Sequence, residues 1–140
     1  MIFGVYPTAV ELYVRQEFMK RDMNIIRLLL LQQESGESPP ELEKYDTQLV
    51  VYNSALMIEA GLIKGVIIED VNGHPTASSI IRMTWEGHDF LDSTRDPSVW
   101  EKAKSSVLKP GVSWSFSILT EVLKAEAKRQ LGLVTGLTSD

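Results

Sequence analysis

The 140-residue sequence contains no cysteine and only two histidines. Without cysteine, the chain can form no disulfide, no thiolate zinc site and no thiol nucleophile. The sequence also lacks a P-loop, a G-x-G-x-x-G dinucleotide motif, an H-E-x-x-H zinc motif and a G-x-S-x-G nucleophile motif. We therefore predict a protein that is not an enzyme, with no catalytic residues, no metal site and no cofactor.

The two histidines, His74 and His88, lie in different predicted elements. His88 and Asp92 would share one face of a helix, because residues four apart are neighbours there. No third ligand follows at a spacing that would complete a metal site, and no carboxylate pair lies in an apolar segment of the kind that retunes a pKa. We interpret His74 as an exposed turn residue.

Long apolar runs are also missing. The longest, from Ile25 to Leu31, is interrupted by Arg27, whereas a membrane-spanning helix needs about 20 apolar residues. The N-terminus has no basic region followed by an apolar segment, as a secretory signal requires. We therefore expect a cytoplasmic protein that does not contact a membrane.

Positive charge is in short supply. The chain has 14 Lys and Arg against 19 Asp and Glu, with a net charge of −5 at pH 7. Binding to a nucleic-acid backbone relies on Lys and Arg, which displace counterions from the phosphates. The acidic balance makes DNA binding less favourable, although basic residues gathered on one face would still permit it.

The apolar pattern predicts an α+β, mainly helical fold. A helix begins after Asp22, a suitable N-cap, and places apolar residues at helical spacing. A short helix follows in the segment PPELEKY, and a further helix runs from Asp46 to Ala60 and ends at Gly61. This order, followed by a hairpin, is the plan of a winged helix-turn-helix.

The hairpin is predicted from two strands, residues 62–69 and 78–84, around the turn signal Asn72–Gly73. The long segment between them would project as a wing. A helix then begins at Trp85, which we expect in the core with Phe90 and Leu91. Another helix begins at Pro97, and the last runs from Ser113 or Ser115 to Leu131, where Gly132 stops it.

These elements suggest three regions. Residues 1–18 form an N-terminal extension, residues 19–104 form the winged-helix domain, and residues 105–140 form a C-terminal helix with a tail. The C-terminal helix carries an apolar stripe that would serve either as the seam of a homodimer or as intrachain packing.

The helix from Asp46 to Ala60 occupies the recognition-helix position, but it contains no Lys or Arg. The commonest specific contact to guanine is therefore unavailable there. Gln48 and Asn53 could read adenine through their amides, or could be a surface amide and a partly buried one. The predicted nucleic-acid-binding residues are Thr47, Gln48, Val51 and Ser54 on this helix, Lys64 and Arg82 at the base of the wing, and His74 at its tip.

Three segments resemble the signature blocks of a known family: MKRDMNIIRLLLLQQE at residues 19–34, EAGLI at residues 59–63 and RMTWEGHDFLDSTRDPSVWEKAK at residues 82–104. The family is a bacterial and phage family known as domain of unknown function 2513. The resemblance covers about residues 19–131 and implies a small winged-helix-like protein of prophages and mobile elements, without implying an activity. The segment MTWEGHDFL is also similar to the end of the wing in many bacterial repressors.

Two functions remain open at this point. The first is a winged-helix DNA-binding regulator of phage or mobile-element type, acting on double-stranded DNA as a homodimer. The alternative is a winged-helix module that does not bind DNA but binds a host or phage protein, as a phage-encoded inhibitor or an assembly factor. We take the first as the leading hypothesis, because of the helix–helix–wing order and the repressor-like end of the wing. The alternative is motivated by the acidic charge and by the absence of Lys and Arg from the helix at residues 46–60.

Overall fold

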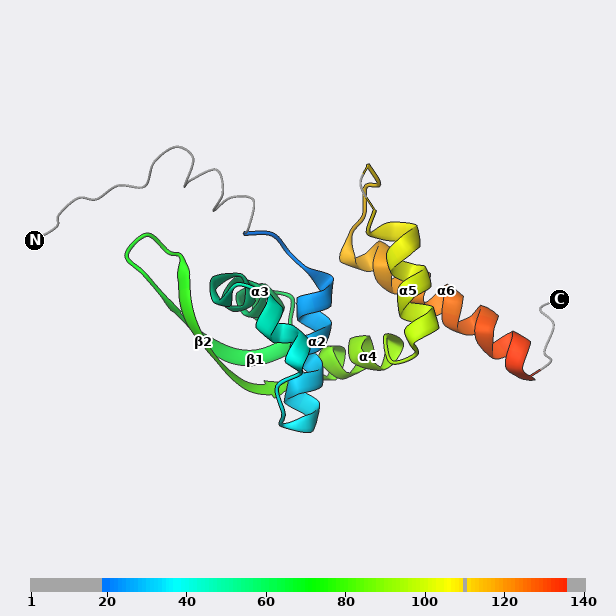
Figure 1. Cartoon of the computed structure of the whole chain (residues 1–140), viewed down its shortest axis with the longest axis horizontal. Coiled ribbons are helices and arrows are strands. Elements are labelled where there is room, and N and C mark those ends of the chain that lie inside the picture. Colours follow the sequence, from blue (N-terminus) through cyan, green and yellow to red (C-terminus); the bar gives the residue numbers. More distant parts are fainter. Residues whose placement is uncertain (1–18, 110, 136–140) are drawn as a thin grey trace, which may run out of the picture. The chain divides into compact units, whose positions relative to one another are not determined.

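The computed structural model describes residues 19–109 and 111–135. Within these ranges the fold is α+β and mainly helical, with five α-helices, one 3₁₀-helix and one two-stranded antiparallel sheet (Figure 1). The chain divides into two compact units, one ending at Thr84 and the other beginning at Trp85. The extension predicted for residues 1–18 lies outside the described residues. None of the described helices is long and apolar enough to cross a membrane.

The first unit begins with α2, Met23–Ser35, and the predicted cap is confirmed. The Asp22 carboxylate accepts hydrogen bonds from the backbone N–H groups of Asn24 and Ile25, at 2.9 and 3.3 Å. These donors have no partner within the helix, so the cap stabilises its start. The buried face of α2 consists of Met23, Ile25, Ile26, Leu29 and Leu30.

A polar loop leads to the 3₁₀-helix η1, Pro40–Lys44, which buries Leu42. Helix α3, Thr47–Glu59, follows, and the Asp46 carboxylate caps it by accepting a backbone hydrogen bond at 2.9 Å. Gly61 lies just past the end of α3 with φ at 78°, a left-handed conformation that glycine adopts without strain, as predicted. Helix α3 packs against α2 and against both strands of the sheet, so it is the centre of the first unit.

The sheet is a hairpin of β1, Ile63–Glu69, and β2, Pro75–Met83. The second strand starts at Pro75 and not at Ser78 as predicted, because Ala77 already pairs with Ile68. The projecting part is therefore a paired hairpin with two register shifts and a short turn, and the prediction of a long wing loop is wrong.

The second unit contains α4, Trp85–Ser93, α5, Pro97–Val107, and α6, Phe116–Thr135. Helix α6 packs against α4 and α5. At their centre, the Phe90 ring lies 5.0 Å from the Phe116 ring and 6.3 Å from the Trp100 ring, measured between centroids. Aromatic pairs at these distances add to the stabilisation that burial provides. The core also includes Leu91, Val99, Ala103, Val107, Leu119 and Leu123.

The expectation that Trp85 joins this core is wrong. Trp85 is 77% exposed, whereas Phe90 and Leu91 are 3% and 0% exposed. The cause is the helical repeat of 3.6 residues, which places Phe90, Leu91 and Thr94 on one side of the helix and Trp85 on the opposite side.

Helix α6 continues through Gly132 to Thr135, so the prediction that Gly132 stops it is wrong. Glycine inside a helix costs only about 1 kcal/mol relative to alanine, which neighbouring residues can offset. Leu119 and Leu123 of α6 are fully buried, and this is the intrachain packing that the sequence left open. The predicted domain boundary at residue 104 falls inside α5, which packs with α6 in the second unit.

Candidate interaction surface

The buried side of α3 includes Ser54, which the sequence analysis assigned to the nucleic-acid-binding side. Asn53, Ser54 and Met57 are its buried residues. Ser54 is 1% exposed, and its hydroxyl donates a hydrogen bond to the Val50 carbonyl at 3.1 Å. The prediction that Ser54 contacts nucleic acid is therefore wrong, because helical phase turns this side chain toward the core and its donor is used within the helix.

Asn53 is a structural residue and not a reader of bases. It is 0% exposed, and its side-chain oxygen accepts a hydrogen bond from the Asp22 N–H at 2.8 Å. Its amide nitrogen donates to the Lys20 carbonyl at 3.1 Å and to the Leu49 carbonyl at 3.0 Å. One amide thereby ties the start of α2 to the middle of α3 and confirms the interpretation of Asn53 as a buried amide.

The outward side of α3 is mainly apolar. Thr47 and Gln48 are exposed at its start, and Val51, Tyr52 and Ala55 are half-buried. The helix carries one charged side chain, Glu59, at its end. This surface therefore offers no cation to a phosphate or to a guanine.

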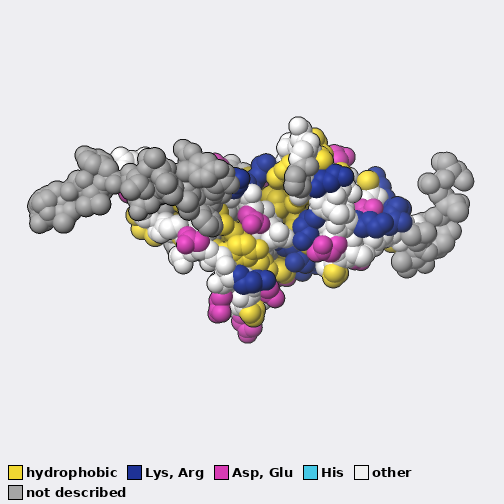
Figure 2. Space-filling model, turned by 45° about the horizontal axis from the view of Figure 1, so that its top comes forward, with side chains coloured by type: hydrophobic (Ala, Val, Ile, Leu, Met, Phe, Trp, Pro, Cys, Tyr) yellow, Lys and Arg dark blue, Asp and Glu magenta, His cyan; other side chains and the backbone are white. Residues whose placement is uncertain are grey.

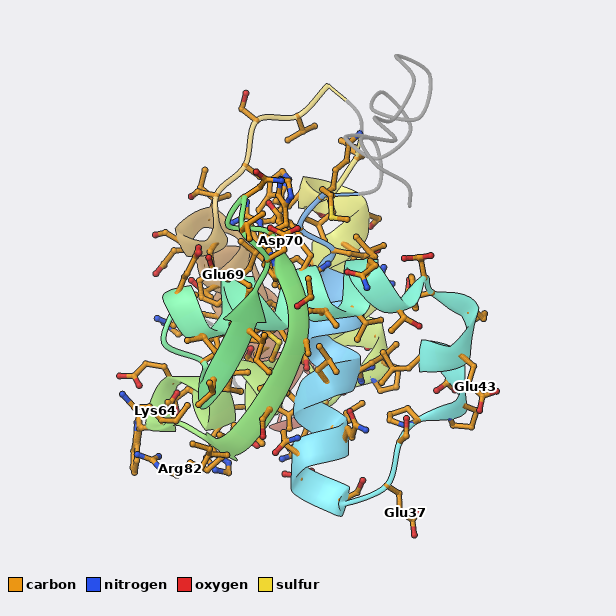
Figure 3. All side chains as sticks on the ribbon, turned by 90° about the vertical axis from the view of Figure 1, so that its left-hand side faces the viewer. Glu37, Glu43, Lys64, Glu69, Asp70 and Arg82 are labelled. Carbon is orange, nitrogen blue, oxygen red and sulfur yellow. The ribbon has the colours of Figure 1, made fainter. Side chains whose placement is uncertain are left out.

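Acidic residues precede α3 in the chain. Glu37, Glu41, Glu43 and Asp46 are exposed, with Lys44 as the one exposed cation in this segment. Figure 3 shows Glu37 and Glu43 at the outside of the first unit, pointing away from α2. On the face drawn in Figure 2, dark blue Lys and Arg side chains stand among acidic and hydrophobic side chains.

The base of the hairpin is basic. Lys64 of β1 pairs directly with Arg82 of β2, and both side chains are exposed. The Arg82 Nη1 donates a hydrogen bond to the Met83 carbonyl at 3.2 Å. Figure 3 shows Lys64 and Arg82 together at this end of the hairpin. The structure thus brings these two predicted residues side by side.

The tip of the hairpin is acidic. The Asp70 carboxylate accepts hydrogen bonds from the backbone N–H groups of His74, at 2.9 Å, and Asn72, at 2.8 Å. These hydrogen bonds, with the His74 contribution the largest, hold the pKa of Asp70 below its ordinary value. The His74 Nδ1 lies 3.4 Å from the other Asp70 oxygen. Glu69 adds a second acid, so a phosphate at the tip would meet two carboxylates.

The predicted nucleic-acid residues fall into three groups. Thr47, Gln48 and Val51 share α3, while Lys64 and Arg82 share the hairpin base. His74 lies at the opposite end of the hairpin, beside a carboxylate. The two cations lie on the strands, and neither α3 nor the hairpin tip adds another, so the groups do not form one basic surface.

A further surface was missed in the sequence analysis. Val66, Ile68 and Ile81 are 56%, 61% and 67% exposed on the hairpin. The many β-branched residues of β1 suggested that the whole strand is buried. The signal that could have revealed the exposed surface is the alternation of residues along the strand. Lys64, Val66 and Ile68 are separated by two positions each, and successive side chains of a strand point to opposite faces.

The two candidate metal ligands considered in the sequence, His88 and Asp92, lie in the second unit. His88 and Asp92 are exposed on α4, and the Asp92 carboxylate lies 2.7 Å from the Arg95 Nε. In the described part of the chain, no group of three or more His, Asp or Glu side chains is placed to hold a metal ion.

Comparison with known proteins identifies the family to which the chain belongs. The family model described as "Hypothetical protein (DUF2513)" matches residues 20–113, and the chain belongs to this family. An uncharacterized protein of Haemophilus influenzae is 27% identical over 119 residues, which covers 81% of this chain and 99% of the relative. No solved structure matches the chain.

Proposed function

We propose that the unit ending at Thr84 is a non-enzymatic, winged-helix-type module that recognises another protein. The order of α2, η1, α3 and the hairpin follows the winged-helix plan, with α3 in the position of the recognition helix. The winged-helix assignment rests on the order of the elements. The proposed recognition of a protein rests on the surface that α3 presents.

The outward side of α3 carries the proposal. Val51, Tyr52 and Ala55 are half-buried there, between the exposed Gln48 and Glu59. Tyrosine is enriched and charged residues are depleted at the centre of protein–protein interfaces. Specific reading of DNA, in contrast, most often uses Arg or Lys, and α3 contains neither.

The charges around α3 indicate what kind of protein would bind. Glu37, Glu41 and Glu43 lie in the segment before the helix, Asp46 caps it, and Glu59 ends it. A partner with an apolar side chain at its centre and Lys or Arg around it complements this arrangement, because opposite charges steer association and fix orientation. A host protein bound by a phage-type inhibitor or assembly factor fits this description.

DNA binding is the second candidate, and one observation favours it. Lys64 and Arg82 lie directly opposite each other at the hairpin base, where they could contact a phosphate. Two cations provide little of the electrostatic affinity on which DNA-binding proteins depend, and the acidic tip, Glu69 and Asp70, opposes it. A regulator would therefore need further cations from elsewhere.

Affinity capture from bacterial lysate tests the proposal if variants are compared. The wild-type chain should retain a stoichiometric protein, and Val51→Asp should lose it, since a carboxylate would then occupy the apolar centre. Tyr52→Ala provides a second variant that removes contact area without adding charge. Ser105→Asp, at an exposed position on α5, is the control for added charge. Equal retention by Val51→Asp and wild type, or no retained protein, would contradict the proposal.

A further inference from the structure

One face of the hairpin is packed and the other is open. Gly65 lies beneath α3, because a Cβ built on it would be 3.2 Å from the Ile58 side chain. The alternate positions of β1 form the other face, here called the outer face: Lys64, Val66 and Ile68, with Asp70 following in the turn. The two apolar residues among them are more than half exposed.

Charge changes sign from one end of the hairpin to the other. Lys64 and Arg82 lie at the base, and Glu69 and Asp70 lie at the tip, as Figure 3 shows at the two ends of the hairpin. From Lys64 to Asp70 the strand rises about 20 Å, at roughly 3.3 Å per residue. Val66 and Ile68 lie between these charged ends, so the order is basic, apolar, apolar, acidic.

We propose that the outer face binds the outer face of a second copy of this chain, with the two hairpins antiparallel. A two-fold axis then places Lys64 against Asp70 of the second copy, and Val66 against Ile68 of the second copy. Interfaces of this symmetry must be complementary to themselves. The order of charges along the hairpin meets that requirement, because reversing the strip sets each basic end against an acidic one.

The neighbouring strand permits this approach. The residues of β2 opposite Val66 and Ile68 are Ser79 and Ala77, which have small side chains. The register shift between Lys64 and Gly65 leaves Ile81 as the additional residue of β2, and its side chain is 67% exposed. Ile81 thus adds exposed apolar surface toward the base of the hairpin, between the residues of β2 that pair with Lys64 and Gly65.

This interface does not depend on the proposed function. Helix α3 packs on the inner face of the hairpin, so the outer face and the outward side of α3 are different surfaces. A dimer formed through the outer faces would present α3 twice. Dimerisation and capture of a bound protein are measured in separate experiments. The dimer proposal can therefore fail while the proposed function holds, and the reverse.

Sedimentation equilibrium over micromolar concentrations tests the apolar part of the interface. The wild-type chain should be a dimer, and Ile68→Lys should be a monomer with an unchanged circular dichroism spectrum, because the side chain is exposed. Ile118→Lys is the matched control, since Ile118 is 46% exposed on α6. A monomeric wild type would overturn the proposal. So would a dimer that Ile68→Lys leaves intact, whether or not Ile118→Lys disrupts it.

Charge exchange tests the antiparallel arrangement. A base variant, Lys64→Glu with Arg82→Glu, makes both ends of the hairpin acidic. A tip variant, Glu69→Lys with Asp70→Asn, makes the tip basic and keeps a side-chain acceptor for the turn. Each variant alone should dimerise at least tenfold more weakly than wild type.

An equimolar mixture of the base variant and the tip variant should form a heterodimer as tight as the wild-type dimer. Both ends of that heterodimer pair opposite charges, whereas both homodimers pair like charges. Restoration in the mixture would show that base and tip meet across the interface. A mixture that stays monomeric, or variants that dimerise as tightly as wild type, would overturn the antiparallel arrangement.

Discussion

The two faces of strand β1 differ in their surroundings: one face is buried and the other is exposed. On the inner face, Ile63 is 1% exposed and Gly65 approaches the backbone of β2 so closely that a Cβ would lie 2.6 Å from the Ser79 carbonyl oxygen. On the outer face, Val66 and Ile68 are more than half exposed. The comparison indicates that the inner face stabilises the fold, while the outer face is free to contribute to association.

The largest expected effect is on stability, and it differs between substitutions on the two faces of β1. Ile63→Ala removes buried methyl groups and leaves a cavity, so we expect it to lower the free energy of unfolding by about 3 kcal/mol. Ile68→Ala on the outer face should change it by less than about 0.5 kcal/mol in the monomer. Hydrogen exchange of peptides from residues 19–84 measures both changes in stability. Tryptophan fluorescence would not serve here, because the three tryptophans all lie outside this range. Equal effects would contradict the assignment of the faces.

The next effect compares two amides on α3. Asn53→Ala leaves the Asp22 N–H and two carbonyls without their partner, so we expect a loss of about 2 kcal/mol in stability. Gln48→Ala, at an exposed position, should stay within about 0.5 kcal/mol of wild type. Urea unfolding followed by circular dichroism provides the measurement. A smaller loss for Asn53→Ala than for Gln48→Ala would show that the buried amide does not join α2 to α3.

The smallest effect concerns pH at the hairpin tip. Hydrogen bonds to the Asp70 carboxylate lower its pKa in the folded chain from the ordinary 3.8. A carboxylate with a lowered pKa stabilises the fold at pH values above its ordinary pKa. This stabilisation is lost as the pH falls through the pKa of the folded state. We therefore expect amide exchange at Asn72 and His74 to accelerate below about pH 4. Asp70→Asn, which cannot ionise, should show no such step, and a step that persists in it would assign the titration to another group.

Local features of the sequence predicted much of the fold. Asp22 and Pro97 marked helix starts, Gly61 marked a helix end, and Asn72–Gly73 marked the turn of the hairpin. Each of these residues acts through its own backbone or the adjacent N–H groups. Such interactions depend on neighbours in the chain, and a single sequence contains the information they need.

Features that depend on tertiary packing were predicted less well. Ser54 and Trp85 were assigned to the wrong sides of their helices, since a shift of one residue in phase rotates a side chain by about 100°. The start of β2 depends on pairing with β1, which local composition does not determine. Val66 and Ile68 have the same residue types as a buried strand, so their exposure follows from which face α3 covers.

Fluorescence anisotropy of a labelled random-sequence DNA duplex, titrated with the protein at about 50 to 200 mM salt, distinguishes the proposed protein-binding module from a DNA-binding regulator. We expect no binding at the lowest salt, because the outward side of α3 lacks Lys and Arg and the hairpin tip is acidic. The contradictory result is binding that falls by roughly 10³–10⁵ across this range, as expected for about 6–10 phosphate contacts, and that Lys64→Ala with Arg82→Ala weakens.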